Sequence, residues 1–387
     1  MLQRSRVVLI YLLGFSLDLV NMFASNVAMP AIGADLHAST GSLAWISAAY
    51  TLGLTIIIPA STRLARAWGE RKLLLASLGG FAMAALLAGM APNTSVLVVC
   101  RFAQGLAGGL LIPVGQAWAY RLTPAHDRTA LTTRIMAIAL FVPALSPWAG
   151  GLLTQLVSWR ALLAASAPAS LAVFALGVIW LPSEKTRLPH EPFLPTVPKL
   201  LRIRTLRVPM LVYLLVPGVF VGVNFVAAID LARIGFAPAD IGAFMVPWAV
   251  ASAIGIGLSR HLFARQGPRK LLALGMLAQS AGIAWLLTVH GGEHASAMTA
   301  YLFMGFGGSL CSSTAQALAF QDVTGRDMLP ASALWNLNRQ FAFFIGPVAL
   351  GGILAVTGYA KVAYVVSICL SLLPIASLRR SFLRASP

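Results

Sequence analysis

The sequence predicts an all-α integral membrane protein with twelve transmembrane helices in two pseudo-symmetric six-helix bundles. Three observations support this fold class: long apolar stretches recur along the chain, basic residues gather on alternate connections, and the two halves of the chain repeat one another. Hydrophobic residues make up 58% of the 387 residues, and charged residues only 10%. A soluble domain usually carries about 25% charged residues, so the composition is that of a membrane protein.

Apolar stretches of about 20 residues, enough to cross roughly 30 Å of hydrocarbon, recur over nearly the whole length. They are too long and too continuously apolar for the strands of a membrane barrel, which have about 10 residues of alternating polarity. Each stretch is therefore predicted to be a helix that satisfies its own backbone hydrogen bonds. In chain order the predicted helices span 7–30, 43–65, 73–91, 95–119, 131–154, 161–181, 208–232, 240–262, 271–290, 296–320, 331–356 and 361–378.

Basic residues are concentrated on one side of this predicted bundle. The chain ends, the connections after even-numbered helices and a central linker hold most of the 28 lysines and arginines, whereas Arg160, Arg233 and Lys361 lie on the other side. The positive-inside rule places the basic side, and with it both termini, in the cytoplasm. We therefore expect a multi-pass protein of the inner (plasma) membrane. Topology and contact with anionic lipid account for the formal charge of +17 without nucleic-acid binding.

The two halves of the chain are predicted to form bundles over residues 1–181 and 208–387, joined by a proline-rich cytoplasmic linker over 182–207. Residues recur at a nearly constant offset: Gly69 with Gly267, Gly105 with Gly305, Gln116 with Gln316, and Pro147 with Pro347. This duplication predicts two bundles related by an axis along the membrane normal. Carriers that move two halves about a site at the midplane have this architecture.

Few ionisable side chains fall inside the predicted helices, where a charge costs about 2.5–3.5 kcal/mol on insertion scales. Of the 11 acidic residues only Asp18 lies deep within a span. Asn21 and Ser25 share its helix face at spacings i+3 and i+7, and this stripe is expected to face a central cavity. Arg101 and Gln104 form a second stripe in helix four. Because arginine cannot lose its proton, Arg101 needs a partner or water.

Asp18 is predicted to be the proton-coupling or substrate-binding acid, because burial and a nearby cation act on a carboxyl group in opposite directions. The alternatives are a permanently paired structural carboxylate at Asp18 and, at Arg101, an arginine bonded to backbone carbonyls. The predicted substrate-binding residues are Asn21, Ser25, Gln104, Asn224, Gln316, Asn338 and Arg339. For the amide side chains the alternative is interhelical hydrogen bonding, worth about 0.6 kcal/mol on average. Asp230 is expected to form an ion pair with Arg233 at the outer rim.

Several short motifs are distinctive. Helix four carries the pattern of Leu, Arg and Gln-Gly within Leu97–Gly105, and helix one ends in Asn26–Pro30 followed by Asp35. These motifs resemble the major facilitator superfamily and, within it, the drug:proton antiporters. The resemblance implies a proton-coupled secondary transporter that works by alternating access. It also implies export of an amphipathic organic compound, either a drug or a metabolite such as a siderophore. Through the helix-four motif, the same resemblance implies that Arg101 helps to govern the protonation of a helix-one carboxylate, and Arg101 thus completes the predicted proton-coupling pair with Asp18.

The connection between helices two and three departs from the family pattern. Arg66 stands where the family has Asp, and Glu70 stands where it has Arg. The resemblance implies a cytoplasmic gate formed by Arg66, Glu70 and Arg71. With the two signs exchanged, Arg66 and Glu70 could still form an i,i+4 ion pair; ordinary loop charge is the alternative.

No enzyme site, metal site or cofactor is expected. The histidines lie in loops or before helix two, and the phosphate-binding loop that ATP-driven transport needs does not occur. The expected partners are a small organic substrate, protons and membrane lipid, and the protein is expected to be a monomer. Two rival functions stay open: a proton-coupled uptake symporter for a small organic acid or sugar, and a non-transporting receptor or assembly factor on a transporter fold.

Overall fold

The computed structural model describes residues 2–124, 127–182, 197–319, 321 and 328–376. Every regular element in these ranges is a helix, which confirms the all-α prediction. The chain divides into two compact units, Met1–Glu191 and Pro192–Pro387. The division falls inside the predicted linker, of which residues 183–196 lie outside the described part of the chain.

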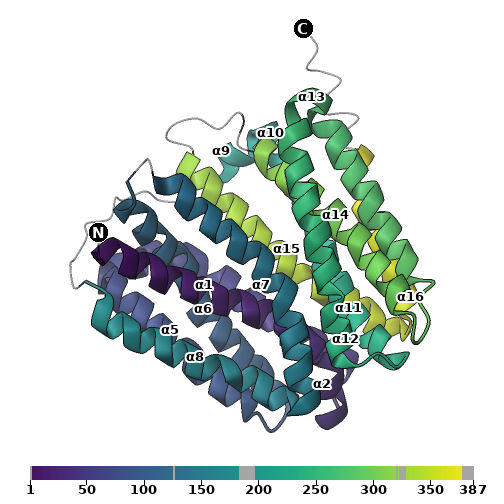
Figure 1. The fold of residues 1–387 in the computed structure, drawn as a ribbon, viewed down its shortest axis with the longest axis horizontal. Helices are drawn as coiled ribbons and strands as arrows, with labels where there is room; N and C mark the ends of the chain where they lie inside the picture. The colour runs from purple at the N-terminus through teal and green to yellow at the C-terminus, as the bar shows by residue number, and fades with distance from the viewer. Residues whose placement is uncertain (1, 125–126, 183–196, 320, 322–327, 377–387) are drawn as a thin grey trace. The chain divides into compact units, whose positions relative to one another are not determined.

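The first unit holds six membrane-length helices among its described residues. They are α1 (Leu2–Val27), α3 (Thr40–Ile57), α5 (Glu70–Gly89), α6 (Thr94–Leu122), α7 (Arg128–Leu156) and α8 (Trp159–Trp180). Short helices α2 (Met29–Asp35), η1 (Ile58–Ala60) and α4 (Ser61–Trp68) lie in the connections. Helix α1 packs against α6, α7 and α8, while α3 packs on α6 and α5 packs on α6 and α8 (Figure 1).

The second unit contains α9 (Val197–Arg202), α10 (Arg204–Leu215), α11 (Pro217–Arg233), α12 (Pro238–Ala243), α13 (Met245–Leu286), α14 (His294–Ala319), α15 (Met328–Thr357) and α16 (Ala360–Leu372). Helices α10 and α11 together form one crossing, and it begins before the predicted start at residue 208. In Figure 1 α13 and α14 run side by side, and α11 packs on α15.

Nine helical stretches of the described chain are long and apolar enough to cross a membrane. One of them, α13, consists of two helices that meet at a kink at Gly267. Dividing α13 there, and adding α14 with the shorter apolar α16, gives the twelve crossings that the hydropathy pattern predicted, six in each unit.

The predicted duplication is visible in the backbone of each unit. Gly69 separates α4 from α5 with φ 81° and ψ 148°, and Gly267 kinks α13 with φ 74° and ψ 155°. This region of positive φ is strained for any residue with a Cβ atom. A second correspondence is a helix crossing: Gly105 abuts the backbone carbonyl of Tyr50, and Gly305 abuts that of Trp248. Both units thus use glycine for the same bend and the same close approach.

Short polar residues fix where three helices of the first unit begin. The side chain of Asn93 accepts a hydrogen bond from the Val96 amide at 2.9 Å at the start of α6. Ser39 and Ser158 do the same for α3 and α8. Each cap satisfies one of the backbone donors that a helix leaves unpaired in its first turn. Beyond the caps the helices bury apolar faces against each other, as Ile10, Leu78 and Trp118 do in the first unit.

An ion pair between α2 and α8 leads to a pH-dependent prediction. The Asp35 carboxylate accepts hydrogen bonds from the guanidinium of Arg160 and, at 3.1 Å, from the indole of Trp159. Chiefly the Arg160 hydrogen bond, and then that of Trp159, holds the pKa of Asp35 below its ordinary value of 3.8. A lowered folded pKa means that this stabilisation is fully present above pH 3.8 and is lost as the pH falls through the lowered value.

We therefore expect Asp35→Asn to lower the unfolding temperature of the detergent-purified protein at neutral pH by roughly 1–2 °C, the effect of an exposed pair. At a pH below the lowered pKa of Asp35, the variant and the parent should have the same unfolding temperature. Scanning fluorimetry at both pH values measures the difference, with Glu293→Gln as a control that removes an acid elsewhere. A difference that persists unchanged in acid would contradict the role assigned to the Asp35 charge.

Candidate functional site

Where α1 crosses α3 and α6, the first unit buries a cluster of polar and ionisable side chains. Asp18 of α1 and Arg101 of α6 are each only 1% exposed, and Tyr50 of α3 is fully buried. Buried ions are costly unless they are paired and hydrogen-bonded. The hydrogen bonds of this cluster therefore decide what it can do.

Tyr50 lies between the carboxylate and the guanidinium. Its hydroxyl donates a short hydrogen bond to Oδ1 of Asp18 and lies 3.3 Å from the Asp18 backbone oxygen. On its other side, the Arg101 guanidinium carbon stands 4.5 Å from the centre of the Tyr50 ring. A cation above a desolvated aromatic face is attracted to it by about 2 kcal/mol or more. Tyr50 thus links the two charged side chains, and the sequence contained no signal that singled it out.

The guanidinium of Arg101 ties α6 to α1. One terminal nitrogen donates to Oε1 of Gln104 at 2.8 Å, and the other donates to the Asn21 backbone oxygen at 3.1 Å and to Oγ of Ser25 at 3.0 Å. Arg101 is therefore not bonded to backbone carbonyls alone. Its Nε is buried and has no acceptor among the described residues. The charge of Asp18 is near enough to act on Arg101 electrostatically.

Gln104 and Asn21 extend this network toward α8. The amide nitrogen of Gln104 donates to Oδ1 of Asn21 at 2.9 Å and reaches Oγ of Ser166 at 3.5 Å. The Ser166 hydroxyl lies 3.4 Å from the same Asn21 oxygen. The structure therefore brings together all five polar residues that sequence spacing placed on two stripes, and adds Tyr50 and Ser166. Ser166 lies on α8 with Ser170 at i+4, and the Ser170 hydroxyl bonds to the Leu78 backbone oxygen instead of joining the network.

Two glycines of α6 make room for the cluster. A Cβ atom at Gly105 would overlap the backbone of Tyr50, so only glycine lets α3 approach this closely. A Cβ atom at Gly108 would lie 2.9 Å from Oδ1 of Asp18 and 3.2 Å from the Tyr50 hydroxyl. Small residues at a helix crossing allow the backbones to come together. Here they position Tyr50 against Asp18.

A cavity of about 310 Å³ adjoins the network between α1, α7 and α8. Its lining is mostly apolar, with Leu17, Val20 and Leu153 among the contributors. The polar residues of its wall are Asn21, Ser25, Ser146 and Ser166, and the Ser146 hydroxyl is buried without a hydrogen-bond partner among the described residues. Pockets of this size and character hold small organic ligands.

The cavity corrects one detail of the sequence prediction. Asn21 and Ser25 line it, whereas Asp18, which spacing placed on the same stripe, does not. The carboxylate points instead to the α3 side of the helix, because the Tyr50 hydroxyl lies there to donate to it. Asp18 is therefore separated from the cavity by its own neighbours on α1.

In the second unit the predicted binding residues are not gathered into one cluster. Asn224 is buried on α11 and accepts a 3.2 Å hydrogen bond from Tyr301. Asn338 is half-buried and donates to the Met210 backbone oxygen at 3.1 Å. Arg339 is half-buried, and Gln316 is exposed. Of the four, Asn224 is the one that is buried, and its hydrogen-bond donor Tyr301 is buried as well.

The expected ion pair at Asp230 does not form. Its Oδ2 accepts a 3.0 Å hydrogen bond from Tyr364 of α16, while Arg233 donates to the Gly358 backbone oxygen at 3.3 Å. No ion pair joins Asp230 and Arg233 in the part of the chain that the structure describes. A fully buried tyrosine on the adjacent helix offered the better-oriented partner for this half-buried carboxylate.

The connection between α4 and α5 also differs from expectation. Gly69, with its positive φ, ends α4 before Glu70 begins α5, so Arg66 and Glu70 are not one turn apart on a continuous helix. The predicted i,i+4 ion pair between Arg66 and Glu70 is therefore wrong. The buried Glu70 carboxylate accepts from Arg121 at the end of α6, and Arg71 donates to the Val178 backbone oxygen at 2.7 Å. These bonds join three helices at the predicted cytoplasmic end.

Among the described residues no group of three or more His, Cys, Asp or Glu side chains is placed to hold a metal ion. What the structure does combine is a bundle of apolar helices, a buried network of ionisable groups and a cavity of small-molecule size. Such a combination defines the class of helical membrane transporters.

The chain belongs to the Major Facilitator Superfamily, whose sequence profile matches residues 11–347. It is 24% identical to the probable actinorhodin transporter of Streptomyces coelicolor, over 87% of this chain and 70% of that protein. It is 30% identical to the probable multidrug resistance protein EmrY of Escherichia coli, over 44% of this chain and 33% of EmrY. The chain thus spans most of the first relative and a third of the second.

Solved structures agree with the fold. A crystal structure of a mutant of the nucleoside transporter NupG superimposes with a TM-score of 0.80 over 98% of this chain and 100% of that one, at 10% identity. At this identity the similarity concerns the fold alone. The family resemblance drawn from the helix-one and helix-four motifs is confirmed by the profile match.

Proposed function

We propose that this protein is a proton-coupled efflux antiporter that exports an amphipathic organic compound by alternating access. The names of its relatives support the direction, since one is a probable multidrug resistance protein and another is a resistance and export protein for tetracenomycin C. The observation that carries the proposal lies within the first unit. Asn21 and Ser25 belong both to the ionisable network and to the wall of the neighbouring cavity.

The cavity supports an amphipathic cargo. Its apolar wall would hold a hydrocarbon or aromatic part, and its serine and asparagine side chains would bind one or two polar groups. The unsatisfied Ser146 hydroxyl is the clearest candidate, because a buried hydroxyl without a partner gains a full hydrogen bond from a ligand. Asn224, Gln316, Asn338 and Arg339 remain proposed contributors from the second unit.

Asp18 is the proposed site of protonation. Burial favours the neutral acid, whereas the Tyr50 hydrogen bond and the Arg101 charge favour the carboxylate, so small movements can change its protonation. Protonation would leave the Arg101 cation buried without a counter-charge, which is strongly destabilising. The packing of α1 on α6 would then give way to an arrangement in which the guanidinium reaches water. That change frees Asn21 and Ser25 and so alters the cavity.

The charge distribution supports a location in the inner (plasma) membrane with both termini in the cytoplasm. The proposed cytoplasmic gate is then the set of contacts around Arg66, Glu70 and Arg71, held by Arg121. The proton gradient supplies the driving force, since one charge moving through 100 mV releases about 2.3 kcal/mol. A monomer suffices, because the network and the cavity lie within one chain.

Transport into membrane vesicles tests the direction. Everted vesicles with an acidic interior should accumulate a cargo from a panel of amphipathic fluorescent dyes, because protons leave as cargo enters. Vesicles from a strain that lacks the protein provide the background. Accumulation in right-side-out vesicles with an acidic exterior would instead indicate an uptake symporter. No movement of any dye under either gradient would indicate a receptor or assembly factor.

A further inference from the structure

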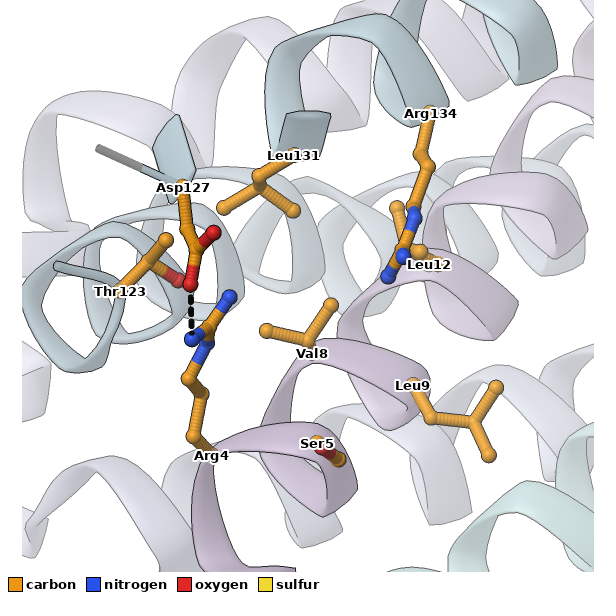
Figure 2. A pocket seen from close by; sticks show the side chains of 9 residues that line it. All are labelled: Arg4, Ser5, Val8, Leu9, Leu12, Thr123, Asp127, Leu131 and Arg134. Carbon is orange, nitrogen blue, oxygen red and sulfur yellow. Dashed lines mark hydrogen bonds and ion pairs between the residues drawn. The ribbon is translucent and has the colours of Figure 1, made fainter. Parts of the chain in front are cut away.

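A second cavity, also of about 310 Å³, lies beside the N-terminal part of α1, before the residues that form the buried network. Figure 2 shows it between the first turns of α1 and the beginning of α7. Its residues come from α1, from α7 and from the connection before α7. The charge pattern assigns this end of the bundle to the cytoplasmic surface.

Two arginines on different helices extend into this cavity. Arg4 of α1 forms an ion pair with Asp127, with 2.6 Å between Nη1 and Oδ2 (Figure 2). Arg134 of α7 reaches into the same space from the opposite wall, is exposed, and makes no ion pair within the described part of the chain. Among the described residues of its lining, two guanidinium groups and one carboxylate give one net positive charge.

The remainder of the lining is aliphatic. Val8, Leu9 and Leu12 follow one another along α1, and Leu131 lies opposite them on α7 (Figure 2). Leu9 is 42% exposed, although its helix is otherwise packed against α6, α7 and α8. Val8 and Leu131 are buried and Leu12 is half-buried, so Leu9 is the exposed apolar side chain of this lining. A cationic site beside such an aliphatic wall matches a ligand that has an anionic group attached to an apolar chain.

We propose that this cavity binds the headgroup of an anionic phospholipid. The phosphate lies against the Arg134 guanidinium, with Arg4 adding positive charge, and the first part of an acyl chain lies along Leu9 and Leu12. Guanidinium forks suit phosphate oxygens, and basic pockets between helices at the cytoplasmic surface are favourable for anionic headgroups. A soluble phosphate would satisfy the arginine but would leave the exposed side chain of Leu9 uncovered. The proposal relies on the proposed orientation and is independent of the direction of transport.

Native mass spectrometry of the detergent-purified protein, titrated with phosphatidylglycerol or phosphatidylcholine, tests this site. The parent should bind phosphatidylglycerol more tightly than phosphatidylcholine. Arg134→Gln should weaken phosphatidylglycerol binding about fivefold, the effect of one basic residue near a membrane surface. Arg134→Lys, which keeps the positive charge but not the planar fork, should weaken binding less than Arg134→Gln does. Arg265→Gln, which removes an exposed arginine of α13 with the same change in charge, should leave binding unchanged.

Two further arms separate the site from simpler explanations. Leu9→Gln, which leaves the charge unaltered, should also weaken phosphatidylglycerol binding, because the acyl chain loses its exposed contact. Glycerol 3-phosphate, which has the anionic group without acyl chains, should not displace the lipid. Equal losses in Arg134→Gln and Arg265→Gln would reduce the effect to diffuse surface charge and overturn the proposal. Binding of glycerol 3-phosphate as tight as that of phosphatidylglycerol would also overturn it.

Discussion

Replacing Asp18 with Asn is expected to reduce gradient-driven accumulation of cargo strongly while the protein remains folded. Asparagine has almost the same shape, and its Oδ1 can still accept the hydrogen bond from Tyr50. What is lost is a group that can bind and release a proton. Coupling free energies between two sites are typically 1–3 kcal/mol, so accumulation driven by the pH gradient should fall by roughly 5- to 150-fold.

The measurement is dye accumulation in everted vesicles with and without an acidic interior, together with the unfolding temperature of the purified variant. Asp230→Asn is a matched control, because Asp230 is also a carboxylate within the helical bundle that accepts a hydrogen bond from a buried tyrosine. It should respond to the gradient as the parent does. Gradient-dependent accumulation by Asp18→Asn at the parental level would remove Asp18 from the coupling mechanism, even if the protein still exports cargo.

A companion variant examines Tyr50. Tyr50→Phe retains the ring beneath Arg101 and removes only the hydroxyl that donates to Asp18. Because that hydrogen bond distinguishes the carboxylate from the acid, its loss should change the pH profile of transport rather than abolish transport. A permanently paired structural carboxylate would show no such change in the pH profile.

Much of the fold could be predicted because a membrane admits few kinds of spanning structure. Apolar length, the distribution of Arg and Lys, and the repeat of Gly69 at Gly267 each depend on the sequence alone. The structure adds that both glycines adopt the same positive-φ conformation. The kink at Gly267 falls between the spans predicted over 240–262 and 271–290, so α13 corresponds to two of the predicted helices.

The candidate site was predictable only where helix periodicity applies. Asp18, Asn21 and Ser25 recur along one helix, as do Arg101 and Gln104, so their faces follow from spacing. Tyr50 was missed because its role arises from the crossing of α3 with α1 and α6, and a single tyrosine in an apolar span has no periodic signal. For the same reason the Arg121 partner of Glu70 and the Tyr364 partner of Asp230 came only from the structure.

The reversed charges at Arg66 and Glu70 show a different limit of prediction from sequence. Spacing suggested an i,i+4 pair, but that rule holds only when the helix continues through both residues. Gly69 interrupts it, and the buried Glu70 at the start of α5 bonds to the end of α6 instead. An isolated glycine does not reveal from sequence whether it will bend a helix or continue it.

Gly105→Ala should be among the most destabilising single-methyl substitutions in the first unit. The added Cβ would overlap the backbone carbonyl of Tyr50, which belongs to α3 and cannot move unless the whole helix moves. Overpacking of this kind costs about 1–3 kcal/mol, and more when the obstacle is backbone. Gly80→Ala on α5 is the control, because its Cβ would lie 3.5 Å from Cβ of Ala107, an ordinary contact. Alanine improves helix propensity by about 1 kcal/mol, so Gly80→Ala should be neutral or stabilising.

The unfolding temperatures of these two variants in detergent test the crossing that places Tyr50. If α3 is pushed away from α6, the Tyr50 ring withdraws from the Arg101 guanidinium and its hydroxyl from Asp18. Gly105→Ala should therefore lose the pH dependence of transport as well as stability, whereas Gly80→Ala should keep both. Equal unfolding temperatures for the two variants would mean that α3 and α6 are not in backbone contact. Tyr50 would then not stand between the carboxylate and the guanidinium, and the arrangement on which the proposed protonation of Asp18 depends would be absent.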